Sequence, residues 1–156
     1  MKILQSLVRT LPLVATAALL AGGAQAQNTP TYAVNQRVAI EVNAIEHAHL
    51  LTEMNAFMQA VHEINVALAQ KDFAQVIRVA TAMGPKGGQH DAVARAVHAK
   101  LPPEWFALAR PTHQNFLAIA QEARANPSVE AIMPRLAATT TQCVACHATY
   151  RLAVKP

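Results

Sequence analysis

The chain has little of what most other classes of protein need. Of its 156 residues, 4% are aromatic and 14% are charged, and only two are cysteine. A chain that is 53% hydrophobic is too apolar for intrinsic disorder, and two cysteines are too few for a disulfide-rich scaffold. What is abundant is alanine, leucine and glutamine, which favour helices over sheets. The composition predicts a single all-α domain.

The first residues have the pattern of a Sec-type signal peptide. Lys2 and Arg9 precede an apolar run over residues 11–21, and residues 24–26 form an A-x-A cleavage site. The run is shorter than the about twenty residues that a membrane span requires. We therefore expect removal of residues 1–26 and export to the periplasm. No other apolar run approaches a span, so we do not expect an integral membrane protein.

The charge of the chain argues against nucleic acid as a partner. Loss of Lys2 and Arg9 would halve the formal net charge of +4. The remaining lysines and arginines are scattered singly, without the basic stripes that a phosphate backbone would require.

Residues 27–156 are expected to form one antiparallel four-helix bundle with short connections. The first expected helix starts near Asn35 or Gln36 and runs for about thirty residues. The later ones are expected at 72–83, in a short piece at 91–100, and at 103–125 and 128–152. Pro111 is expected to kink its helix or to end that helix's first section. Pro134 could instead mark the first turn of the last helix.

Apolar residues in the first of these helices recur at intervals of three and four, which predicts a wide buried face. One strip comprises Ile40, Ala44, His47, Leu51, Met54, Met58 and Val61, and an adjacent strip comprises Leu50, Phe57, Ile64 and Leu68.

Both cysteines lie in one pentapeptide, Cys143-Val144-Ala145-Cys146-His147, which is a C-x-x-C-H motif. Two thiols three residues apart lie on one face of a helix, where they can add to the two vinyl groups of one haem. The adjacent His147 then supplies an axial ligand to the iron. The motif predicts covalently bound haem c, and the export signal agrees, because bacteria attach this haem outside the cytoplasm.

Other roles for two cysteines at this spacing lack supporting features. A structural disulfide and a thioredoxin-like redox pair do not explain the adjacent histidine, and the redox pair belongs at a βα turn. A zinc site needs more ligands at suitable spacing.

The string CVACHATYR, residues 143–151, resembles the end of class II c-type cytochromes, the cytochrome c-prime family and its low-spin relatives. These proteins are four-helix bundles with C-x-x-C-H near the C-terminus. The resemblance implies that Tyr150 packs near the proximal haem face and that Arg151 pairs with a haem propionate, although Arg151 could equally be a solvated charge. It also makes a homodimer a possibility.

The sixth iron ligand must come from upstream, because no methionine follows His147. By the resemblance, the distal face is lined by the early part of the first helix. There His47 is the leading candidate, His49 and Met54 are weaker ones, and an open or apolar sixth position is the alternative. His62, His90, His98 and His113 are expected at the surface or rim, and Met58, Met83 and Met133 in the core.

The leading functional hypothesis is a periplasmic electron carrier, not an enzyme, with other periplasmic redox proteins as partners. The alternative is a five-coordinate haem that binds nitric oxide or carbon monoxide. A peroxidase-like enzyme is a third hypothesis, but it needs an arginine beside a distal base, and no nearby residue clearly supplies one.

Overall fold

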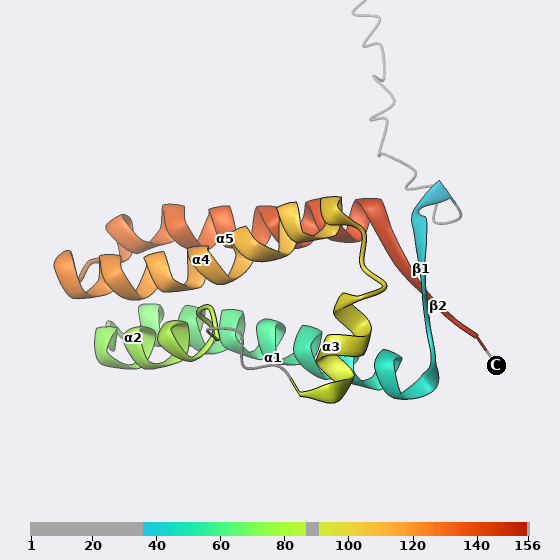
Figure 1. Ribbon diagram of the computed structural model, residues 1–156. Coiled ribbons are helices and arrows are strands. Elements are labelled where there is room, and N and C mark those ends of the chain that lie inside the picture. Colours follow the sequence, from blue (N-terminus) through green and yellow to red (C-terminus); the bar gives the residue numbers. More distant parts are fainter. Residues whose placement is uncertain (1–35, 87–90, 156) are drawn as a thin grey trace, which may run out of the picture. The chain divides into compact units, whose positions relative to one another are not determined.

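The structure, a computed structural model, describes residues 36–86 and 91–155, and this part of the chain is mostly helical (Figure 1). The predicted signal peptide and His90 lie outside the described residues. In chain order the elements are β1 (Val38–Val42), α1 (Ala44–Ala69), α2 (Phe73–Ala82), α3 (Ala92–His98), α4 (Pro103–Ala125), α5 (Val129–Thr149) and β2 (Tyr150–Val154). The helices confirm the largely α-helical class, whereas the two strands were not predicted.

Four of the helices begin at a side chain that accepts a hydrogen bond from the first turn. Asn43 and Glu46 form a reciprocal capping box at α1, and Asp72, Asp91 and Ser128 cap α2, α3 and α5. Each cap satisfies a backbone N–H that has no partner inside the helix. The predicted starts of α2 and α3 are thereby confirmed.

The prediction that a helix starts at Asn35 or Gln36 is wrong. Residues 38–42 form β1, and α1 begins only at Ala44. Ile40 and Val42 are buried while their neighbours in the strand are exposed, which is the period of two of a strand. Ile40 also fits the predicted helical stripe, because a single apolar residue is consistent with either period.

The last helix is also shorter than predicted, since α5 ends at Thr149 and residues 150–154 form β2. The two strands are parallel, with Val38 opposite Tyr150 and Val42 opposite Val154. This pairing joins segments about a hundred residues apart, so no local pattern around residue 150 announces it.

Neither proline ends a helix. α4 continues through Pro111, which had been expected to kink it or to end its first section, and α5 includes Pro134. Tertiary packing along both helices outweighs the backbone hydrogen bond that each proline removes. The start of α4, with Pro103 in its first turn, is as predicted.

The long helices pack in sequence order around one core. α1 packs on α2, α2 on α4, and α4 on α5, whereas α1 and α5 make few contacts with each other. The core between these helices includes Ile64, Val76, Phe116, Ile119 and Ile132, all fully buried. The side between α1 and α5 is therefore the least closely packed side of this part of the chain.

A second core lies at the end of the structure that carries the paired strands β1 and β2, which are called the ladder below. It comprises Ile40, Val42, Leu50, Val97, Leu101, Trp105 and Tyr150. These residues come from both strands, from α1, α3 and α4, and from the segment between α3 and α4. The second core thus joins the start of α1 to the end of α5.

Candidate functional site

The C-x-x-C-H motif occupies the last two turns of α5, immediately before β2. Cys143 and Cys146 are half-buried and form no disulfide, and His147 is exposed. Residues three and four apart are neighbours on a helix, so Cys143, Cys146 and His147 share one side of α5. The structure thus brings the three motif residues together on a regular helix, as the spacing predicted.

The two thiols lie in apolar surroundings. Cys146 packs against the second core, and the Cys143 Sγ lies 3.5 Å from the Thr139 carbonyl oxygen, to which it donates a weak hydrogen bond. Burial raises the pKa of both thiols, and the neighbouring Cys143 raises that of Cys146 further. Reactive redox cysteines have a lowered pKa, so this environment does not favour a thioredoxin-like role.

The backbone of His147 is held from the other end of the sequence. The Arg37 Nη1 donates hydrogen bonds to the carbonyl oxygens of His147, at 3.0 Å, and of Tyr150, at 3.4 Å. Carbonyls in the last turn of a helix lack partners within it, and a cation is favourable at that end. Sequence reasoning missed Arg37, because nothing near residue 37 indicates a partner 110 positions away.

Tyr150 is buried in the second core, beside the motif. Its ring lies 5.1 Å from that of Trp105, between centroids, at an angle of 53°. Burial, followed by the nearby Glu104, raises the pKa of the Tyr150 hydroxyl, which keeps it protonated. Tyr150 therefore anchors the end of α5 to the first turns of α4.

Arg151 lies on the other face of the ladder from Tyr150, because side chains alternate along a strand. Its Nε is buried and has no hydrogen-bond partner among the described residues. A buried guanidinium N–H without an acceptor is costly, and a carboxylate is the acceptor that suits its forked geometry best. The donor fits the propionate role that the resemblance implies for Arg151.

The predicted buried face of α1 is rotated from the observed one. The residues buried in α1 are Glu46, Leu50, Ala60, Ile64, Ala67 and Leu68. Leu51 and Met58, expected to face inward, are 46% and 67% exposed. Together the two apolar strips predicted one wide buried face. In the structure mainly the second strip packs into the core, and the first strip lies on the flank of α1, beside the buried face.

That flank carries two of the three candidate distal ligands. His47 and Met54 are half-buried, and at about 100° per residue they lie within about 20° of each other around α1. His49 lies on the opposite flank, where its Nε2 is 4.0 Å from the Glu53 Oε2 and where it interacts with Asp91 at the start of α3. His47 and Met54 share a side, and His49 does not.

Contacts to α4 mark one side of α1 and one side of α5. On α1, the Phe57 ring stacks on Phe116 of α4, and His47 and Met54 lie beyond Phe57, away from α3. On α5, Arg135 pairs with Glu122 of α4 at 3.5 Å, and His147 lies about 120° further around the helix. Both flanks therefore face the sparsely packed side between α1 and α5.

The two paired strands lie between the end of α5 and the start of α1. α5 leads directly into β2 at the level of Val38, and α1 begins just after Val42, at the far end of the ladder. Figure 1 shows both strands running across from the end of α5 to the start of α1. Four residue steps along a strand span about 13 Å. Helices in direct contact have axes only about 8–10 Å apart.

Some of the other histidines and methionines pack against the protein, and some are exposed to solvent. His62 is exposed, and His98 and His113 are half-buried, the latter bonding through Nδ1 to the Met83 carbonyl oxygen at 2.9 Å. Met83 packs against the first core as expected. The expectation that Met58 and Met133 fill the core is wrong, since they are 67% and 43% exposed on the flanks of α1 and α5.

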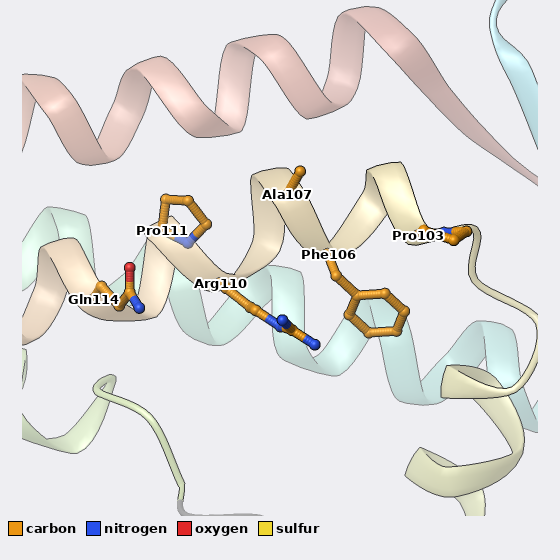
Figure 2. Close-up of a pocket in the computed structure, with 6 residues that line it drawn as sticks. All are labelled: Pro103, Phe106, Ala107, Arg110, Pro111 and Gln114. Atoms are coloured by element: carbon orange, nitrogen blue, oxygen red, sulfur yellow. The ribbon is translucent and has the colours of Figure 1, made fainter.

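Two shallow surface depressions lie away from the motif. Figure 2 shows one of them on α4, where Arg110 extends beside the ring of Phe106, 5.5 Å from its centroid. The other lies along β1 and includes Lys100 and Lys155. Neither is lined by a residue of the C-x-x-C-H motif.

Within residues 36–86 and 91–155, no three histidine, cysteine or acidic side chains come together as a metal site would need. In the same residues, no helix combines the length and apolar content of a membrane span. No family model, no curated protein and no solved structure matches the chain.

Proposed function

We propose that this chain is a periplasmic mono-haem c-type cytochrome that transfers electrons between other periplasmic proteins. In this proposal Cys143 and Cys146 hold one haem through thioether bonds, His147 is the proximal iron ligand, and α1, α2, α4 and α5 form an antiparallel four-helix bundle. The observation that carries the proposal is the C-x-x-C-H motif on the last turns of α5, where Cys143 and Cys146 are half-buried and form no disulfide. The signal-peptide pattern of residues 1–26 supports the periplasmic location.

The residues present fit a haem. The porphyrin is a flat apolar group that needs an apolar surface on each side, and Leu51 and Met58 on α1 offer such a surface outside the core. The α1 and α5 helices make few contacts with each other, so their flanks are only sparsely covered by protein. The unpartnered Nε of Arg151 offers a donor to a propionate.

When bound, the haem would supply a one-electron redox centre. The protein residues would tune and orient it: Arg37 holds the carbonyl of His147, and Tyr150 and Trp105 fix the end of α5. Burial raises the pKa of both thiols. On attachment, each thiol would add its sulfur and its hydrogen across one vinyl double bond of the haem, and no oxidant would be needed.

We propose His47 as the sixth ligand, supplied from the flank of α1. It is half-buried on the side of α1 that also carries the exposed apolar residues Leu51 and Met58. Met54 shares its side of the helix and is the second candidate. Protein ligands on both sides of the iron suit an electron carrier, because the coordination then changes little between oxidation states.

Absorption spectra of the mature protein, produced with the haem-maturation machinery, test this function. We expect sharp low-spin bands in the oxidised and reduced states that do not change under carbon monoxide. A broad high-spin spectrum that shifts with carbon monoxide would contradict the electron carrier and favour the gas-binding alternative. Peroxide turnover well above that of free haem would favour an enzyme instead.

A further inference from the structure

Arg37 makes a long-range contact to the proposed site that the C-x-x-C-H motif does not account for. It lies just before β1, yet its guanidinium bonds to the carbonyl oxygens of His147 and Tyr150, 110 and 113 positions away. The first of these carbonyls belongs to the last turn of α5, and the second belongs to the first residue of β2. One side chain therefore fixes the point at which the motif helix becomes a strand.

This contact has a consequence for charge as well as position. The guanidinium remains protonated at all accessible pH values, so it places a permanent positive charge beside the backbone of His147. The ladder keeps it there, because Arg37 directly precedes Val38, which pairs with Tyr150. The nearest described ion pair along β1, Glu41 with Lys155, is internally compensated and lies toward the other end of the ladder.

We propose that Arg37 is a positioning residue that fixes His147 and raises the reduction potential of the site. This inference rests on the proposed function. A fixed cation close to the iron ligand disfavours the oxidised centre, which carries one more positive charge than the reduced one. Arg37 does not touch the iron; it acts through the carbonyl of His147 and through its charge.

The test compares three variants of the full mature protein by spectroelectrochemical titration. Arg37→Gln removes the charge and shortens the side chain that carries the donor, and Arg37→Lys keeps the charge. Arg78→Gln is the matched control, since it removes the same charge from the exposed side of α2. We expect a more negative potential in Arg37→Gln, most of it restored in Arg37→Lys, and little change in the control. A shift in Arg37→Gln no larger than in the control would overturn the proposal.

A second measurement needs no haem. Hydrogen exchange of the full chain should be faster over residues 147–152 in Arg37→Gln than in the wild type, because the two carbonyls lose their shared donor. Unchanged exchange there would overturn the positioning role. The two proposals also fail separately: wild-type protein without haem contradicts the cytochrome, whereas a haem-bearing wild type with an unshifted Arg37→Gln potential contradicts only the role of Arg37.

Discussion

The rings of Trp105 and Tyr150 pack against each other at 5.1 Å and join the start of α4 to the first residue after the motif helix. Both side chains are more than nine-tenths buried, in a core that also receives both strands. Trp105 and Tyr150 therefore affect both the stability of the second core and the position of His147.

Truncation of Trp105 should therefore destabilise the fold and disturb the motif together. We expect Trp105→Ala to lower the free energy of unfolding by about 3 kcal/mol or more, since it leaves a cavity in the second core. Urea denaturation followed by circular dichroism measures this. Val66→Ala, on the exposed side of α1, is the control and should change stability by less than about 0.5 kcal/mol. Equal effects of the two substitutions would show that the second core is not packed as described.

Glu46 should make stability depend on pH in the acid range. Hydrogen bonds from the Lys100 side chain, 2.5 Å away, and from the Asn43 backbone lower the pKa of this carboxyl below 4.5. A carboxyl with a lowered pKa in the folded state adds stability above its unfolded pKa, and that stability is lost as the pH falls through the folded pKa.

Two substitutions test that dependence. Both Glu46→Gln and Lys100→Met should reduce stability near neutral pH and flatten the loss of stability as the pH falls below the ordinary pKa of a glutamate carboxyl. Denaturant titrations at several pH values measure the slope. A Lys100→Met protein with the wild-type slope would mean that the pair does not set the pKa of Glu46.

The distal-ligand proposal predicts a change of spin state in one variant. His47→Ala should convert a low-spin haem spectrum to a high-spin one, because the sixth position loses its imidazole. His49→Ala is a close control: it removes a histidine two residues away, on the flank that faces Glu53 and Asp91. An unchanged spectrum in His47→Ala, with a changed one in Met54→Ala, would assign the ligand to Met54.

Arg151 should have opposite effects in the presence and absence of haem. Without haem, Arg151→Met removes a buried donor that lacks a partner, so stability should rise by up to about 1 kcal/mol. With haem, the same substitution removes a propionate partner and should lower stability. Thermal unfolding of both forms measures the difference. Equal effects in the two forms would place Arg151 away from the haem.

The features that the sequence could predict are those encoded within a few residues. Asp72 and Asp91 cap their helices through the third residue that follows, and the C-x-x-C-H spacing places three side chains on one side of a helix. The features it could not predict depend on distant partners. Val38–Val42 and Tyr150–Val154 become strands because each is the other's partner, and Arg37 matters only because of that pairing.

The exposed flank of α1 is a second feature that the sequence could not predict. Apolar repeats of three and four predict a helix, but periodicity alone does not say which of two adjacent apolar strips faces the core. Leu50 and Ile64 are buried, while Leu51 and Met58 are left outside. The proposed haem would cover this flank.

The intact mass of the mature protein under denaturing conditions tests the central claim most directly. Produced with the haem-maturation machinery, the wild type should carry the added mass of one haem that does not dissociate in acid, and a Cys143→Ala/Cys146→Ala double variant should lack it. A wild-type mass equal to that of the polypeptide alone, under conditions that mature a known c-type cytochrome, would contradict the account.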